Sequence, residues 1–167
     1  MAVLPILEYP DKRLREQARP VQAVTPEIQQ LVDDMAETMY AAPGVGLAAT
    51  QVDVHKRIIV MDISDARDEL LVLVNPEIIT ASGEIECEEG CLSVPGYYDK
   101  VVRAARVTVR AKNERGELFE RTAEDMLAVC VQHEMDHLVG RMFVDYLSPL
   151  KRARLKSKQR KKQRLVG

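Results

Sequence analysis

Tryptophan is absent from the 167-residue chain, phenylalanine occurs only twice, and there are only three cysteines. A small and odd number of cysteines does not suit a disulfide framework and favours reduced thiols or metal ligands. No apolar run approaches the length of a membrane span. The N-terminus shows neither the charged-then-apolar pattern of a secretory leader nor an Arg- and Ser-rich transit composition, so we expect a cytoplasmic protein.

Acidic residues are missing from the C-terminal end. Residues 151–167 carry nine Lys or Arg and no Asp or Glu, whereas the rest of the chain holds 15 basic and 26 acidic residues. This asymmetry indicates that the two parts have different surroundings. We expect one folded domain over 1–149, of a length that can bury a single core. A basic helix or tail should follow over 150–167, with too few apolar residues to bury a face.

The stretch at positions 133–137 reads His-Glu-Met-Asp-His. On a helix, His133 and His137 lie one turn apart on the same face, so both rings can reach a single metal ion. Glu134 can then polarise a bound water, as in the H-E-x-x-H pattern of hydrolytic metal sites. Thr122–Asp125 predicts the helix start as a capping box, and Gly140 predicts its end. The alternative is two histidines with ordinary hydrogen-bond partners on a buried helix.

The third ligand decides which kind of metal site this is. A catalytic zinc-type site usually takes three protein ligands and leaves one position for water. The metzincin position, six residues after His137, is Phe143, and no Glu, His or Cys follows His137. The third ligand is therefore Asp145 or a residue upstream, which disfavours ordinary zinc proteases.

The cysteines are the upstream candidates. Cys130 lies one turn before His133, where its short side chain is poorly placed to reach the same ion at about 2.3 Å, so lining the wall beside the metal is its better role. Cys87 stands among carboxylates, which disfavour a thiolate. Cys91 lies in a loop-like stretch that can offer its sulfur to a distant helix, and it is the preferred ligand. A small buried hydrophobe is the alternative role for Cys91.

The remaining pattern predicts an α+β fold. Strands of small sheets should be arranged around the central helix that carries the metal motif, with a further helix at the C-terminus. An N-terminal helix should begin at Thr25–Pro26 and end before Ala41. β-Branched runs predict strands at Arg57–Ile63, Leu70–Val74, Val102–Arg110 and Leu118–Arg121, the last two joined by a turn at Asn113–Gly116.

Two glycines in Gly44–Gln51 permit a close backbone approach to a ligand. The stretch lacks both the G-x-G-x-x-G spacing and a following Lys-Ser/Thr, which argues against a phosphate-binding loop. Taken alone, a plain turn before a strand explains it equally well.

Three stretches of the chain resemble, in order and spacing, the three motifs of bacterial peptide deformylase. They are Gly44-Val45-Gly46-Leu47-Ala48-Ala49-Thr50-Gln51, Glu89-Gly90-Cys91-Leu92-Ser93 and His133-Glu134-Met135-Asp136-His137. The resemblance runs from Val3 to Pro149 without a large insertion. Gly96-Tyr97-Tyr98 departs from it, because other members carry a Glu-Gln-Arg type segment there.

The resemblance implies a metallohydrolase that removes the N-formyl group from N-formylmethionyl nascent peptides and releases formate. It assigns Cys91, His133 and His137 to one divalent metal ion. In this family the ion is usually iron(II) in the cell, although zinc, nickel or cobalt suit the same donors. Iron(II) beside a thiolate would make the activity sensitive to oxygen.

For catalysis, the resemblance implies that metal-bound water attacks the formyl carbon with Glu134 as general base and then general acid. The Gln51 side-chain amide and the Leu92 backbone N–H would stabilise the oxyanion. For Gln51 alone, an exposed polar residue entering a strand is the alternative.

For substrate binding, the resemblance implies an apolar pocket for the methionine side chain beside the His133 ring, lined by Val45, Cys87, Met126 and Cys130. The substrate backbone would lie extended, as an added strand does, along Gly44, Val45 and Gly46 on one side and Cys87, Glu89 and Gly90 on the other.

A C-terminal helix in this family is associated with docking on the ribosome near the exit tunnel. The resemblance therefore implies that 150–167 binds ribosomal RNA or proteins in the bacterial cytoplasm, with no role for DNA or a membrane. Two other classes stay open. One is a metal-dependent amidase or peptidase acting on another N-acyl substrate, and the other is a non-catalytic ribosomal RNA-binding module with a structural metal. The RNA-binding module would need four protein ligands that leave no open position on the metal, and Glu134 would then be dispensable.

Overall fold

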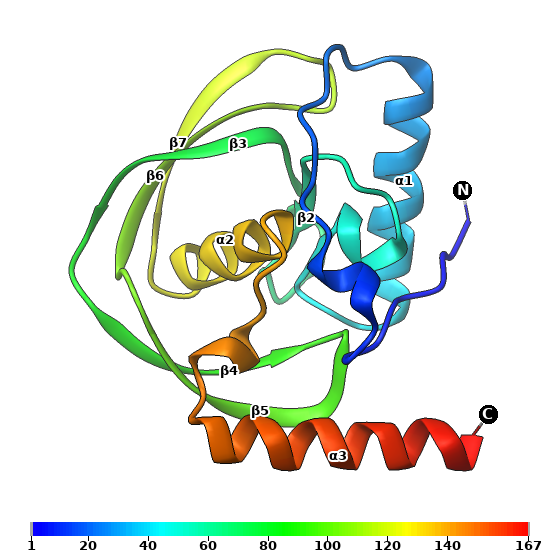
Figure 1. Cartoon of the computed structure of the whole chain (residues 1–167). Coiled ribbons are helices and arrows are strands. Elements are labelled where there is room, and N and C mark those ends of the chain that lie inside the picture. The colour runs from blue at the N-terminus through cyan, green and yellow to red at the C-terminus, as the bar shows by residue number, and fades with distance from the viewer. Residues whose placement is uncertain (1, 167) are drawn as a thin grey trace.

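The computed structural model describes residues 2–166. Helix α2 (Asp125–Leu138) lies at the centre, with an antiparallel sheet curving around it and a two-stranded ribbon on another side (Figure 1). The sheet has five strands in the order β1 (Gly46–Ala48), β2 (Ile58–Met61), β3 (Leu71–Ser82), β6 (Arg106–Lys112) and β7 (Leu118–Glu124). The ribbon pairs β4 (Ile85–Cys91) with β5 (Val94–Arg103). The other helices are α1 (Pro26–Ala41), α3 (Pro149–Val166) and three short 3-10 turns, η1 (Lys12–Arg15), η2 (Ala49–Val52) and η3 (Phe143–Tyr146). The expected α+β fold around the motif-bearing helix is confirmed.

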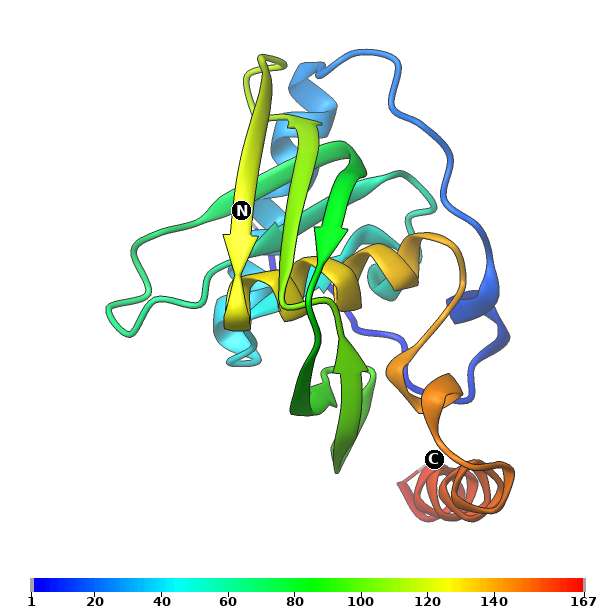
Figure 2. The same ribbon diagram turned by 90° about the vertical axis from the view of Figure 1, so that its left-hand side faces the viewer.

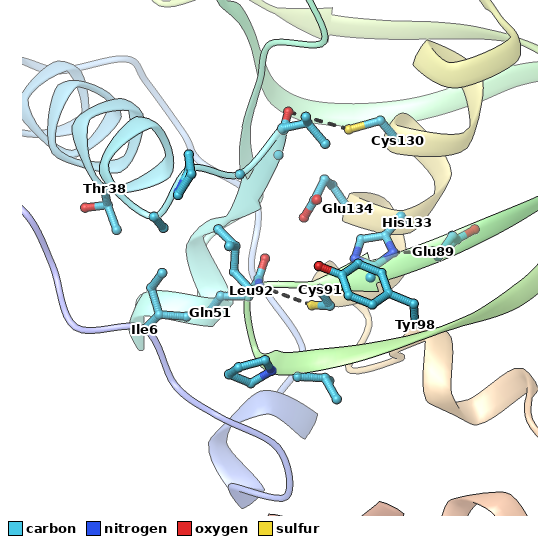
Figure 3. Close-up of a pocket in the computed structure, with 18 of the residues that line it drawn as sticks. Ile6, Thr38, Gln51, Glu89, Cys91, Leu92, Tyr98, Cys130, His133 and Glu134 are labelled. Atoms are coloured by element: carbon cyan, nitrogen blue, oxygen red, sulfur yellow. Dashed lines mark hydrogen bonds and ion pairs between the residues drawn. The ribbon is translucent and has the colours of Figure 1, made fainter.

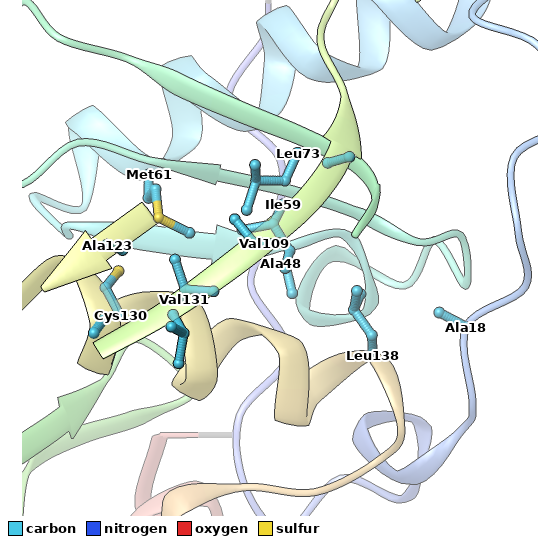
Figure 4. Close-up of a cluster of buried hydrophobic side chains, with 13 residues drawn as sticks. Ala18, Ala48, Ile59, Met61, Leu73, Val109, Ala123, Cys130, Val131 and Leu138 are labelled. Carbon is cyan, nitrogen blue, oxygen red and sulfur yellow. The ribbon is translucent and has the colours of Figure 1, made fainter. Parts of the chain in front are cut away.

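Helix α2 packs on one face of the sheet and α1 covers the other face at β1 and β2, so β2 is buried on both sides. Strand β2 shows this in its sequence, because Ile59 and Met61 belong to the core formed with α2 (Figure 4). Ile58 and Val60 belong to the core formed with α1. A continuous apolar run rather than an alternating one is typical of such a strand. This part of the sheet is thus held between α1 and α2, and it fixes where the face of α2 with the metal motif points.

The start of α2 differs from the predicted capping box. Thr122 belongs to β7, where its hydroxyl lies 3.0 Å from that of Thr108 on β6. The helix begins at Asp125, and Glu124 at the N-cap makes no side-chain capping bond. Strand pairing therefore overrides the local capping signal. The predicted end is correct: Gly140 has φ +77°, and a Cβ there would lie 2.3 Å from the carbonyl oxygen of Arg15.

The strand predictions are correct in place but not in extent. Strand β3 continues beyond Asn75, whose side chain exchanges two 2.7 Å hydrogen bonds with the backbone of Val21. The strand expected over Val102–Arg110 is divided between β5 and β6, because the Gln132 side chain on α2 bonds both backbone groups of Ala104 at the break. The stretch that carries Cys91, expected to be loop-like, is instead the end of strand β4, which also includes the acidic run before it.

Helix α3 is an ordered element and not a frayed tail. It runs beneath β5 along the edge of the molecule (Figures 1 and 2). Leu155 is buried in a core with Val94, Val101 and Phe143, and Lys151 donates to Asp99 at 3.1 Å. The segment has few apolar residues, as expected, but Leu155 is enough to hold the helix against the body. In the described residues, no helix is both long and apolar enough to span a membrane.

Candidate active site

Three potential metal-ligating atoms meet where α2 faces the end of β4. The rings of His133 and His137 have centroids 5.1 Å apart, and the Cys91 Sγ lies 3.4 Å from the Nε2 of His137. One ligand atom from each of the three residues falls within 4.8 Å of the others. A sulfur and a nitrogen bound to one tetrahedral ion lie about 3.6 Å apart, given metal–sulfur and metal–nitrogen bonds of about 2.3 and 2.05 Å. The set therefore fits a single metal ion.

A buried ionic network orients His133. The Nδ1 of His133 lies 2.9 Å from Oε1 of Glu89, which directs Nε2 of the same ring towards the thiol. Arg103 donates to both oxygens of Glu89 at 2.8 and 2.9 Å and to Asp136 at 2.7 Å. Burial raises the pKa of Glu89, but hydrogen bonds from Arg103 and His133 outweigh it and bring the pKa to about 2. Glu89 is thus a fixed anion that holds the imidazole in place.

The second histidine has a different environment. His137 is fully buried, and burial lowers its pKa well below the ordinary value, with a further contribution from the nearby positive charge of His133. Its imidazole is therefore neutral, which is the form that binds metals.

Glu134 projects into the cavity between α2 and β1 (Figure 3). Burial raises its pKa to about 7, and its Oε1 has no hydrogen-bond partner among the described residues. A Cβ on Gly46 would lie 2.5 Å from Glu134 Oε2 and 2.9 Å from Cys130 Sγ. A side chain at this position would therefore displace the carboxylate and the thiol, which explains the glycine where β1 passes Glu134.

Gln51 is buried in η2, which rules out the exposed role considered for it. Its Oε1 accepts from the Ala48 N–H at 2.9 Å, and its Nε2 donates to Ser93 Oγ at 3.0 Å and lies 3.6 Å from Cys91 Sγ. The amide is therefore held beside the thiol. Leu92 directly follows Cys91 in the sequence, and its side chain packs on Gly44. A Cβ on Gly44 would lie 2.6 Å from the Cδ1 of Leu92.

The cavity has a volume of about 760 Å³. Its lining includes every residue expected to bind substrate: Gly44, Val45, Gly46, Cys87, Glu89, Gly90, Met126 and Cys130. Gln51, Cys91, Leu92, His133 and Glu134 also line it, whereas His137 lies behind them. At the apolar end, the sulfurs of Cys87 and Met126 lie 3.7 Å apart.

The rejected ligands have other roles. Asp145 makes two hydrogen bonds to Arg15, at 2.7 and 3.0 Å. Burial raises the pKa of the Cys130 thiol well above its ordinary value, with the carboxylate of Glu134 adding to the effect. Burial also raises the pKa of Cys87, and the negative charges of Glu89 and Glu88 raise it further. Neither cysteine therefore forms a thiolate easily.

Some residues of the site escaped prediction. Arg103 is the last residue of β5, of which the predicted strand Val102–Arg110 includes only two residues, and no local pattern marks it as the partner of Glu89. Ile6 and Val129 line the cavity as apolar residues without any distinguishing motif. Tyr98, in the segment that departs from the deformylase pattern, lies over Gly90 at the cavity mouth and is 63% exposed.

Comparisons with known proteins agree with this geometry. The polypeptide deformylase family model matches residues 3–153. The chain is 63% identical over 164 residues to peptide deformylase 2 of Nitrosomonas europaea, covering 98% of this chain and 89% of that protein. A crystal structure of a peptide deformylase from Legionella pneumophila superposes with a TM-score of 0.93 at 53% identity, covering 99% of this chain and 98% of that one. The peptide deformylase of Ehrlichia chaffeensis in complex with actinonin gives a TM-score of 0.95 at 44% identity, with 98% and 99% coverage. Because sequence and structure agree over nearly the whole length, the chain belongs to the polypeptide deformylase family of hydrolases.

Proposed function

We propose that this enzyme removes the N-formyl group from N-formylmethionyl nascent peptides by hydrolysis and releases formate. The observation that carries the proposal is the Glu134 carboxylate. It is buried, has an oxygen without a partner among the described residues, and faces the same cavity as Cys91 and His133. A purely structural metal site has no need of such a group, whereas a hydrolase needs a base beside the ion.

We further propose that Cys91, His133 and His137 hold one divalent ion, iron(II) in the cell. A thiolate with two imidazoles also accepts zinc, nickel or cobalt, so elemental analysis of protein purified without oxygen is the test of this choice. When bound, the ion supplies a Lewis acid and a water molecule of lowered pKa.

In the proposed mechanism, Glu134 accepts a proton from the attacking water and later gives it to the leaving amine. Burial raises its pKa to about 7 before a metal ion binds, and this raised pKa makes the side chain better able to accept and then donate a proton. The Gln51 amide and the Leu92 N–H stabilise the charge that develops on the formyl oxygen, each by about 3 kcal/mol. The bonds from Gln51 to Ala48 and Ser93 support this role, because they hold the amide in place before substrate binds.

Substrate recognition then depends on the cavity walls. The methionine side chain enters the apolar end beside Cys87, Met126 and Cys130, and the following backbone pairs with Gly44–Gly46 and with the end of β4. Main-chain pairing does not depend on the later side chains, so we expect broad tolerance beyond the first residue.

Comparison of formylated and acetylated substrates tests the proposed reaction. We expect kcat/KM for a formyl-methionyl tripeptide to exceed that for the acetyl-methionyl analogue by at least about 100-fold, because the acetyl methyl must fit where the formyl hydrogen lies. Release of formate or acetate under anaerobic conditions is the measurement. Similar rates for the two substrates would instead indicate a general N-acyl amidase.

We propose that helix α3 docks on the ribosome near the exit tunnel. In this proposal, residues 150–167 form a basic docking element and residues 1–149 form the catalytic domain. The protein would then act in the cytoplasm. The support is charge: Arg154, Lys158 and Lys161 are exposed at helical spacing, while Leu155 holds the helix to the body.

Neutralising that charge should weaken ribosome binding without affecting catalysis. We expect the triple change of Arg154, Lys158 and Lys161 to Gln to lower ribosome affinity at least about tenfold at low salt and to flatten its salt dependence. Turnover of a formylated tripeptide should be unchanged. The control is Arg106→Gln with Arg115→Gln, two exposed cations on β6 and in the turn between β6 and β7, which should keep full affinity. Equal affinity of the triple variant and the control would exclude docking through α3.

A further inference from the structure

The loop between β2 and β3, residues 62–70, crosses the back of the glycine-rich stretch. Most of its side chains are exposed, but that of Arg67 is half-buried. The backbone of Arg67 has φ +57°, in the left-handed region that a residue with a side chain seldom adopts. Such a conformation persists only where surrounding contacts determine it, so the contacts of Arg67 indicate its role.

The Arg67 guanidinium bridges two carbonyl groups. One amino group donates to the carbonyl oxygen of Gly44, and the other donates to that of Asp62 at 2.8 Å. The planar group also lies over the Tyr40 ring, 4.9 Å from its centroid. A guanidinium suits this position because it is flat and presents several donors in a fixed arrangement.

Asp62 anchors the loop that carries Arg67. Its carboxylate accepts from the Tyr40 hydroxyl at 2.6 Å, from the Ser64 N–H at 2.9 Å and from the Glu69 N–H at 3.1 Å. Burial raises the pKa of Asp62, but these hydrogen bonds outweigh it and bring the pKa to about 2. The loop is therefore tied to α1 and cannot easily swing away.

This loop holds two consecutive carbonyl groups of the cavity wall. Arg67 holds that of Gly44, and the backbone N–H of Asp62 donates to that of Val45 at 2.8 Å. Gly44 also touches the Leu92 side chain. The segment is thus confined between the loop behind it and Leu92 in front.

We propose that Arg67 is a positioning residue for substrate binding, which keeps Gly44–Gly46 extended and ready to pair with the peptide backbone. The inference rests on the proposed function, because it takes these residues as the wall along which the substrate lies. Without the guanidinium, the Gly44 carbonyl loses its donor and the segment must be ordered again each time a peptide binds.

The test is Arg67→Ala assayed with substrates of two lengths. We expect KM for a formyl-methionyl tripeptide to rise about tenfold, with kcat changed less than about twofold because the reacting groups stay in place. For formyl-methionine, which has no following residues to pair, KM should change much less. Arg67→Lys should fall between the wild type and Arg67→Ala, because one amine cannot reproduce the fixed arrangement of donors.

The control is Asp65→Ala, an exposed change on the same loop, which should match the wild type. Metal content and melting temperature are measured for every variant. The positioning role would be overturned if Arg67→Ala kept the wild-type KM for both substrates, or if its KM rose equally for both. If the wild type itself releases no formate, the proposed function fails instead, so the two failures are distinguishable.

Discussion

Replacing Glu134 with glutamine is expected to lower kcat for formate release by about 10²–10⁴-fold, the range that a positioned general base contributes. Glutamine keeps the shape of the side chain beside Gly46 but cannot accept the proton. Metal content should be unchanged, because Glu134 is not among the three residues that converge on one point. Steady-state kinetics with parallel elemental analysis measures both effects.

The pH dependence gives a second readout of the same group. The base must be ionised, so kcat/KM should fall as the pH drops through the pKa of Glu134, which burial raises to about 7 in the absence of a metal ion and which is lower beside a divalent ion. This acid limb should disappear in Glu134→Gln. Glu86→Gln, an exposed change on β4, is the matched control and should keep the wild-type profile. A Glu134→Gln variant with most of the wild-type kcat would mean that another group takes the proton.

Replacing Cys91 with alanine is expected to abolish metal retention and, with it, activity. Only two imidazoles of the three-residue donor set would remain. Loss of a residue that merely hydrogen-bonds to a ligand weakens metal binding by up to about 100-fold, so loss of a ligand itself should weaken it by more than that. Elemental analysis after gel filtration measures retention, and circular dichroism shows whether the fold persists.

Cys87→Ala separates loss of the ligand from loss of a nearby thiol. Cys87 also lies on β4 and lines the same cavity, but it is not part of the convergent set. Cys87→Ala should retain the metal. A Cys91→Ala protein that keeps one metal ion per chain would show that the thiol is not a ligand.

The parts of the site that could be predicted are those that secondary structure fixes locally. Histidines four apart must share a helix face, so the spacing of His133 and His137 was sufficient to place both rings on one side of α2. Cys91 was chosen over two other thiols by their surroundings, and its sulfur does meet the histidines. The strand that presents it was not foreseen, because the acidic run of β4 does not resemble a buried strand.

The parts that escaped prediction depend on pairing between distant segments. Arg103 meets Glu89 because β4 and β5 form a ribbon, whereas the sequence predicts no strand at β4 and only the last two residues of β5. Thr122 resembled a helix cap but is paired with β6, and tertiary pairing outweighed the local motif. Arg67 lies in an exposed loop, where a single arginine normally signals only a solvated surface.

Strand β1 has a consequence for the behaviour of the protein at high concentration. It is the terminal strand of its sheet and, in residues 2–166, it pairs with β2 alone. An open edge invites strands of other molecules and is a common starting point for aggregation. This edge is only three residues long and its residues are buried, and the Ala48 N–H already donates to Gln51, so it gives another copy too few free hydrogen-bonding groups for a lasting pair. In the proposed binding mode a peptide anchored by its methionine needs only the few groups that face the cavity at Gly44–Gly46, so the segment can receive substrate without promoting self-association.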